Sequence, residues 1–168
     1  VLRLYRERGG LWPPQVSGAP VMRAEVLGKT FPIRHSAKVV HAVDNVTLGI
    51  RKAEALGLVG ESGSGKTTVG RLLVRLLEPT GGRVVFAGQD LTTLDTAAMR
   101  ALRARVQIVF QDPFDSLDPR WTVRQLLDEP LRLHATLDAA GRRARAIAAL
   151  ARVDLPETLL DRRPRGLG

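Results

Sequence analysis

Three short segments before residue 60 have the hydrophobic pattern of β-strands. Residues 22–27 suit a short strand, and residues 39–50 alternate loosely between apolar and polar positions, as a half-buried strand does. A third apolar run, residues 55–59, ends at a glycine. The pattern therefore predicts three strands in this part of the chain.

The pattern then changes to the period of a helix. Apolar residues recur on one helical face at Val69, Leu72, Leu73, Leu76 and Leu77, and the next proline and glycines predict the helix end. Residues 83–87 have the pattern of a strand and 96–105 that of a short helix. The apolar, β-branched run 106–110 predicts a buried strand.

The last third of the chain is predicted to be a loop followed by helices. Residues 112–120 contain two prolines and three aspartates, which favour a loop. Residues 122–134 and 138–153 have helical patterns, and Asp138 suits the N-cap of the second. Strands that alternate with helices predict an α/β domain with a largely parallel or mixed sheet.

Residues 1–21 show no period and are rich in glycine and proline. We expect a disordered extension, or sequence translated upstream of a true start at Met22. The chain has 168 residues, of which 44% are hydrophobic, so its size and composition suit one globular domain. Its apolar runs are too short to span a bilayer or to form a secretory signal.

The chain is strongly basic, with a net charge of +9, and contains no cysteine. The absence of cysteine excludes disulfides, thiolate metal sites and cysteine nucleophiles. The charge invites a nucleic-acid hypothesis, but the arginines cluster in three separate segments, 100–105, 142–145 and 162–165. Because a phosphate footprint should form one face or stripe, solvated helix faces or contacts to a partner subunit are favoured.

The strongest motif is a glycine-rich loop that matches G-x-x-x-x-G-K-[ST] in full. It follows a predicted strand and precedes a predicted helix, which is the context a phosphate-binding loop requires. Glycines let backbone N–H groups wrap around phosphates, and the helix adds the positive end of its dipole. The candidate binding residues are Gly60, Glu61, Ser62, Gly63, Ser64, Gly65, Lys66, Thr67 and Thr68.

Two residues of the loop have specific chemical roles. Lys66 would direct a positive charge at the β- and γ-phosphates, and the Thr67 hydroxyl could ligate Mg²⁺, which prefers oxygen ligands. The loop therefore predicts a nucleoside triphosphate as ligand, without distinguishing adenine from guanine. A flexible Gly/Ser turn is the structural alternative, and the motif together with its context disfavours it.

The run V-Q-I-V-F-Q-D-P at residues 106–113 has the form of a strand that ends in glutamine. Together with the phosphate loop, it resembles the Q-loop of the ATP-binding subunits of ABC transporters. The longer run 110–120 is similar to the form found in oligopeptide and dipeptide importers, as are residues 72–80 and 42–46. The similarity covers about residues 22–160, most of the chain.

The resemblance implies roles for two further residues. Gln111 would contact the Mg²⁺ and attacking-water region and couple it to membrane subunits, since an amide can accept from water and bind a metal. A polar residue at a strand end is the alternative for Gln111. Phe31 lies where the family has an aromatic ring that stacks on adenine, and simple packing of the ring is its alternative.

The resemblance also implies an organisation and a set of partners. Residues 22–111 would form the P-loop nucleotide-binding core, and 112–168 the Q-loop with part of a helical subdomain. The ligands would be ATP and Mg²⁺. The partners would be membrane-spanning permease subunits, a second ATPase subunit and, indirectly, an extracytoplasmic solute-binding protein, with the chain at the cytoplasmic face of the membrane. Peptides are the leading transported substrate, with nickel and other small solutes as alternatives.

Two departures from the family pattern stand out. Ala53 replaces the glycine that usually precedes Glu54, which predicts modest strain in that turn. The sequence also stops before the signature loop, the Mg²⁺-binding aspartate, the catalytic glutamate and the switch histidine of the family. The alternative function is therefore a nucleotide-binding remnant that does not hydrolyse ATP.

Other chemistry-bearing residues have simpler interpretations. Asp112, Asp115 and Asp118 lack the pattern of a calcium loop and are expected to form turns. The three histidines, His35, His41 and His134, lack metal-ligand spacing and are expected on the surface or in packing roles. A stripe of apolar residues in the 122–134 helix is expected to form subdomain core.

Overall fold

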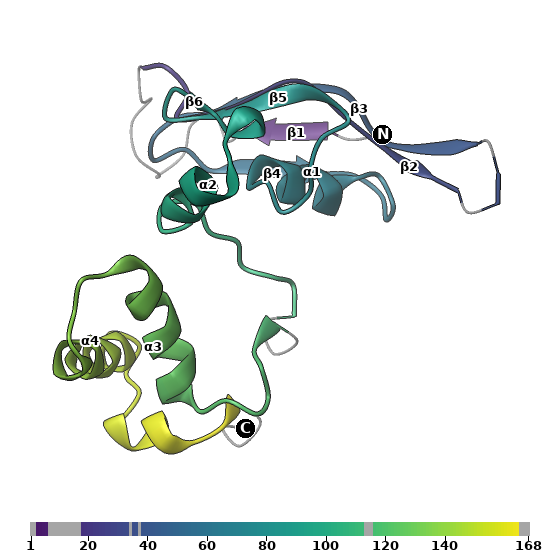
Figure 1. The fold of residues 1–168 in the computed structure, drawn as a ribbon. Coiled ribbons are helices and arrows are strands. Elements are labelled where there is room, and N and C mark those ends of the chain that lie inside the picture. The colour runs from purple at the N-terminus through teal and green to yellow at the C-terminus, as the bar shows by residue number, and fades with distance from the viewer. Residues whose placement is uncertain (1–2, 7–17, 34, 37, 113–115, 165–168) are drawn as a thin grey trace. The chain divides into compact units, whose positions relative to one another are not determined.

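The structure, a computed structural model, describes residues 3–6, 18–33, 35–36, 38–112 and 116–164 (Figure 1). It divides into two units, residues 1–106 and 107–168. The division follows Val106, whereas the sequence placed the boundary after Gln111. The first unit contains β1 (Arg3–Arg6), β2 (Met22–Pro32), β3 (Val39–Ile50), β4 (Leu56–Val59), α1 (Lys66–Leu73), β5 (Gly81–Phe86), β6 (Gln89–Asp90), a 3-10 turn (Leu91–Thr93) and α2 (Thr96–Leu102).

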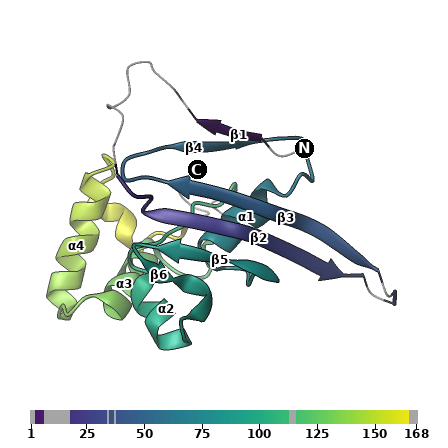
Figure 2. The same ribbon diagram turned by 90° about the horizontal axis from the view of Figure 1, so that it is seen from above.

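A four-stranded antiparallel sheet, with strand order β3-β2-β5-β6, dominates the first unit. β2 and β3 form a long hairpin in which Met22 pairs with Ile50 at one end and Pro32 with Val39 at the other. Figure 2 shows the two strands side by side along their length. The register of this pair shifts at three places, so the hairpin contains irregular positions that a simple alternating pattern does not predict.

Helix α1 covers one face of this sheet and shares its core (Figure 1). Its buried residues Val69, Leu72 and Leu73 pack with Leu27, Val43 and other buried side chains of the strands. The helix ends at Leu73, earlier than the pattern predicts, because Arg75 adopts a positive φ of 49°. The Arg103 guanidinium donates to the carbonyls of Val74 and Arg75 just beyond this end.

The α/β fold class is confirmed, but all pairings between described strands are antiparallel rather than parallel. The alternation rule assumes that a helix joins neighbouring parallel strands. Here β2 and β3 are joined as a hairpin, and α1 leads from β4 to β5, which pairs with β2 in the other sheet.

The prediction that residues 1–21 are disordered is wrong for Arg3–Arg6. These residues form β1, which pairs antiparallel with β4 from Arg3 opposite Val59 to Arg6 opposite Leu56. The edge of a strand carries unpaired backbone N–H and C=O groups. β1 provides hydrogen-bond partners for these groups of β4. Residues 7–17 of the predicted extension lie outside the described residues.

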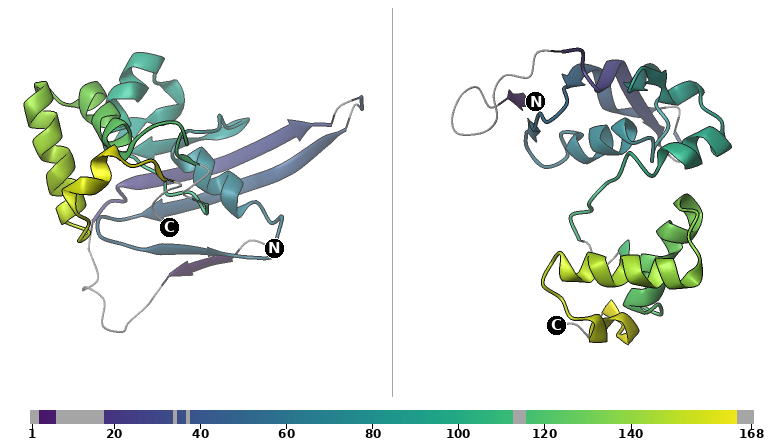
Figure 3. Two further views of the ribbon diagram at one scale, coloured as in Figure 1. Left: turned by 90° about the horizontal axis from the view of Figure 1, so that it is seen from below. Right: turned by 90° about the vertical axis from the view of Figure 1, so that its left-hand side faces the viewer.

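The second unit consists of helices α3 (Val123–His134) and α4 (Ala139–Ala151) and a 3-10 turn (Glu157–Asp161) (Figure 3). The sequence predicts both helices, and the predicted first residues, 122 and 138, are the N-caps of the helices. Thr122 forms a capping box with Gln125, and the Asp138 side chain accepts from the N–H of Gly141. Ala146, Leu150 and Leu160 form a small core, with Val123 and Leu127 of the predicted apolar stripe packed against it.

The prediction of a buried strand at 106–110 is wrong, because these residues form no strand in the structure. Val106 is buried in the core of the first unit, but Val109 is 90% exposed. A buried strand needs hydrogen-bonded neighbours, and no described strand pairs with this segment. Its apolar composition indicates a strand only where such neighbours exist.

Candidate nucleotide-binding site

The glycine-rich loop lies between the end of β4 and the start of α1, as the motif requires. Leu56 and Leu58 of β4 pack against the core, which fixes the strand that enters the loop. Gly63 and Gly65 have positive φ angles of 79° and 93°. These angles are in the left-handed region that side chains with a Cβ rarely adopt, so the loop needs glycine at both positions.

Gly65 also packs against the backbone of the β2–β3 hairpin. A Cβ at Gly65 would collide with the carbonyl oxygen of Ala42. Lys29 pairs with Val43 and Thr30 with His41, so Ala42 is the extra residue of a β-bulge. The bulge brings the Ala42 carbonyl against the loop, and this contact fixes where α1 begins.

The Lys66 ammonium lies within the loop itself. Its Nζ donates to the carbonyl oxygens of Gly60 at 2.7 Å and Glu61 at 2.6 Å. A third, longer contact of 3.4 Å reaches the Ser64 hydroxyl. An ammonium has three donors, so loop atoms satisfy all of them and keep the charge at the centre of the loop.

The first turn of α1 presents backbone donors and no negative charge. Gly65 is the N-cap without a side-chain hydrogen bond, and the turn contains no acidic residue. The first N–H groups of a helix have no intrahelical acceptors, and the helix dipole makes this end positive. Thr67 is exposed and Thr68 is half-buried in the same turn. The arrangement suits an anion with several oxygen atoms.

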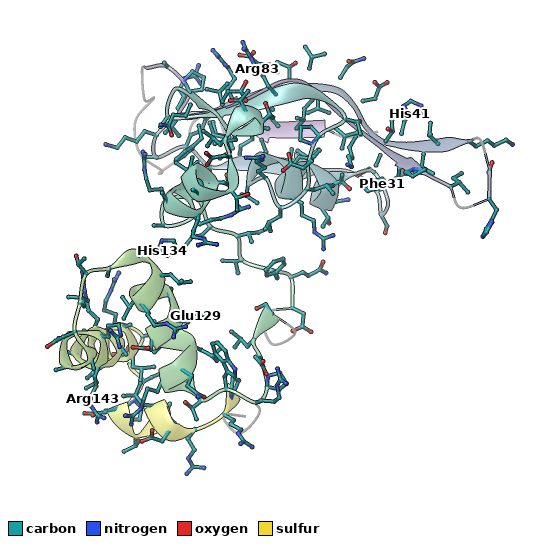
Figure 4. The ribbon with its side chains drawn as sticks, viewed as in Figure 1. Phe31, His41, Arg83, Glu129, His134 and Arg143 are labelled. Carbon is teal, nitrogen blue, oxygen red and sulfur yellow. The ribbon has the colours of Figure 1, made fainter. Side chains whose placement is uncertain are left out.

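Phe31 lies on β2 close to the segment of the hairpin that contacts the loop. It pairs with Val40, which is two residues from Ala42, a separation of about 6–7 Å along a strand. Phe31 is 38% exposed, and the Lys29 ammonium lies 5.2 Å from the centroid of its ring. Figure 4 shows Phe31 and His41 on the two strands of this hairpin. The structure thus brings Phe31 into the same unit and region as the loop.

Gln111 belongs to the second unit, whereas the loop belongs to the first. Its side chain is exposed. Of the three aspartates that follow, Asp115 lies outside the described residues. Asp118 accepts from the backbone and side chain of Arg120, as expected for a turn. The hydrogen bonds from Arg120 lower the pKa of Asp118 to about 2.

The histidines form no metal site within the described part of the chain, where no group of metal-ligating side chains gathers. His35, His41 and His134 are all exposed, and His134 is in the other unit from the first two. Sequence patterns missed two residues, Ala42, which lies against Gly65 of the loop, and Lys29, which lies over the ring of Phe31. The bulge at Ala42 depends on strand register, and the position of Lys29 depends on three-dimensional packing, so neither leaves a local signal.

The α/β fold and the glycine-rich loop between β4 and α1 together have the arrangement of a P-loop protein. The ABC transporter family profile matches residues 43–167, which is most of the chain. The chain therefore belongs to the ABC transporter family. A solved structure supports this: the dimeric ATP-binding cassette MJ0796 bound to ADP and Pi has a TM-score of 0.72 and 28% identity. That likeness covers 88% of this chain and 63% of the cassette.

Curated relatives are more similar in sequence. The chain is 45% identical over 145 residues to the glutathione import ATP-binding protein GsiA of Escherichia coli strain K12, covering 83% of this chain. It is 43% identical over 143 residues, or 85% of this chain, to a Brucella ovis protein whose provisional name is peptide import ATP-binding protein. The chain spans 23% of the first relative and 44% of the second. Within the described residues, no helix is long and apolar enough to cross a membrane.

Proposed function

We propose that this chain binds Mg·ATP and is the energy-coupling part of an ABC-type importer, with peptides as the transported class. The observation that carries the proposal is the complete phosphate loop between β4 and α1, with the Lys66 ammonium held inside it. Relatives named for glutathione and peptide import support the transported class. Glutathione is itself a small peptide, so the two names agree in chemistry.

The donors around the loop fit a triphosphate. The first-turn amides of α1 and the Lys66 ammonium supply positive charge, and no acidic side chain of that turn opposes it. Phosphate oxygens are better acceptors for the Lys66 ammonium than the loop carbonyls that it now contacts, because they carry negative charge and the carbonyls are neutral. Lys66 would therefore exchange the carbonyls of Gly60 and Glu61 for phosphate oxygens when nucleotide binds.

Magnesium fits the oxygen donors that the chain offers. Thr67 carries an exposed hydroxyl in the first turn of α1, and Gln111 has an exposed amide whose oxygen could also bind a metal. Bound Mg²⁺ would neutralise charge on the phosphate oxygens. The assignment of Gln111, and of Phe31 to adenine, rests on the family resemblance of the runs that contain them.

The partners follow from the same family membership. We infer that the chain acts at the cytoplasmic face of a membrane through permease subunits, beside a second ATPase subunit. A solute-binding protein would deliver the transported peptide and would not contact this chain. The basic residues scattered over both units then serve as solvated or subunit-contacting surface rather than as a nucleic-acid site.

The experiment is a titration with a fluorescent ATP analogue in the presence of Mg²⁺. The Lys66→Ala variant removes the phosphate-directed charge, and a lost charged hydrogen bond of about 1.5–3 kcal/mol weakens binding about ten- to a hundred-fold. Lys52→Ala is the matched control, because Lys52 is an exposed lysine in the turn before β4. Equal affinities for the wild-type chain and Lys66→Ala would contradict the proposal.

A further inference from the structure

Lys29 holds a cation against the ring of Phe31. The two residues are separated by one position on β2, so their side chains share a face of the strand. The Lys29 ammonium lies 5.2 Å from the ring centroid, within the range of a cation–π contact. It also donates to the carbonyl oxygen of Glu78 at 2.7 Å, and Lys29 is half-buried. Two contacts therefore fix the ammonium beside the ring.

This lysine lies where the hairpin passes the phosphate loop. Lys29 pairs with Val43, the residue that follows the bulged Ala42, and Ala42 touches Gly65. Lys29 is thus connected to the loop through the paired strand β3, and to Phe31 along its own strand β2. Glu78, which accepts from Lys29, follows the end of α1. The segment that follows α1 and the ring of Phe31 are consequently joined through the Lys29 side chain.

We propose that Lys29 is a positioning residue for the base of a bound purine nucleotide, acting through Phe31. This inference rests on the proposed function, in which Phe31 stacks on adenine. A ring already held by a cation loses less conformational freedom when a base stacks on it. Phe31 is 38% exposed, so a base can reach the residue. Lys29 thereby favours a triphosphate that carries a purine over a bare triphosphate.

The test compares two ligands that share the phosphates and differ in the base. ATP and inorganic tripolyphosphate are titrated against the wild-type chain, Lys29→Met and Lys29→Arg by calorimetry. We expect Lys29→Met to weaken ATP binding about two- to five-fold, the size of an exposed cation–π contact, and to leave tripolyphosphate binding unchanged. Lys29→Arg keeps the cation and retains the wild-type ratio of the two affinities. Lys52→Met, at an exposed lysine outside these contacts, is the control for lost net charge.

Two results would overturn the inference. Equal losses for ATP and tripolyphosphate in Lys29→Met mean that the lysine attracts phosphate or supports the fold. An unchanged affinity for ATP in Lys29→Met means that the contact between Lys29 and Phe31 does not contribute to binding of the base. Phe31→Ala separates these failures from failure of the proposed function: if it leaves the ratio of the two affinities unchanged, base stacking itself is absent. Lys66→Ala tests the phosphate loop independently of either residue.

Discussion

The two units are stabilised by different kinds of interaction. In the first, buried residues from three strands, two helices and a 3-10 turn form one core, from Ala24 to Val106. In the second, α4 and the 3-10 turn supply three buried residues, and α3 packs against them with partly buried side chains. The phosphate loop belongs to the first unit, so its geometry depends on contacts between segments distant in sequence. The second unit has a smaller core, capped helices, and ion pairs that join its elements, such as Arg124 with Asp161 and Arg142 with Asp128.

The largest expected effect on stability comes from truncating one buried leucine in each core. Leu72 and Leu160 are both almost completely buried, one in each core. Leu72→Ala should lower the stability of the first unit by about 2–5 kcal/mol, because it leaves a cavity beneath the sheet. Leu160→Ala should destabilise the second unit alone. Residue-resolved hydrogen exchange checks this, and a loss of protection in both units from either variant would break the comparison.

The contact between the bulge and the loop gives the next effect. Gly65→Ala combines a strained φ of 93° with a collision against the Ala42 carbonyl. We expect ATP binding to weaken by about ten-fold or more, because the start of α1 must move by enough to lose phosphate-directed donors. Gly63→Ala is the matched control, since its φ of 79° is similarly strained but a Cβ there meets nothing within 4 Å. Equal affinities of the two variants would show that the bulge does not position the loop.

Features that have a local signal in the sequence could be predicted from it. The phosphate loop, the start of β2, both ends of β3 and the cap at Asp138 each have a local signal, and each is where the sequence predicts it. The end of β2 is not, because the strand runs to Pro32 and not to Leu27. The run at residues 106–113, together with the phosphate loop, also identified the family correctly. These features depend on residue types at fixed spacing, so the chain itself contains the necessary information.

The features that the sequence did not predict depend on contacts with other segments of the chain. Residues 106–110 have the composition of a strand but no described strand pairs with them, and β1 pairs with β4 from a segment without any period. The bulge at Ala42 arises from the register of two strands. Whether Gln111 meets the loop depends on how the two units pack, which no local pattern encodes.

Helix capping should affect the second unit alone. The Asp138 side chain accepts from the Gly141 N–H at the start of α4. Asp138→Ala should cost about 0.5–2 kcal/mol of stability in that unit and leave ATP affinity unchanged. Chemical denaturation, followed by probes in each unit, measures the change. A matching loss of stability in the first unit would contradict the separation of the two cores.

A gain of stability is expected in the first unit at Ala53. Its φ is 59°, so the strain predicted from the missing glycine is present, in a turn where the Arg51 N–H donates to Glu54 Oε2 at 2.6 Å. Ala53→Gly relieves a strain of about 1–2 kcal/mol from the left-handed conformation. It also raises the conformational entropy of the unfolded chain, which lowers the stability by about 0.4–1 kcal/mol. The net gain should be roughly 0.5–1 kcal/mol by the same principles. A lower melting temperature would show that the turn tolerates alanine without strain.

The smallest effect is a pH dependence in the second unit. The hydrogen bonds from Arg120 lower the Asp118 pKa to about 2 from an ordinary value of 3.8. The contribution of this pair is therefore present above the ordinary pKa and is lost as the pH falls towards 2. An NMR titration of the Asp118 carboxyl measures the midpoint, and Arg120→Gln should raise it towards the ordinary value. An unchanged midpoint in that variant would rule out Arg120 as the cause.

The central claim is that the loop between β4 and α1 binds the phosphates of Mg·ATP. Hydrogen exchange of the chain with and without Mg·ATP tests it most directly, with Lys66→Ala measured beside the wild type. We predict slower exchange at the amides of residues 65–68 in the wild-type chain, because these amides would donate to phosphate, and no such change in Lys66→Ala. Unchanged exchange at these amides in wild-type chain saturated with Mg·ATP would contradict the account.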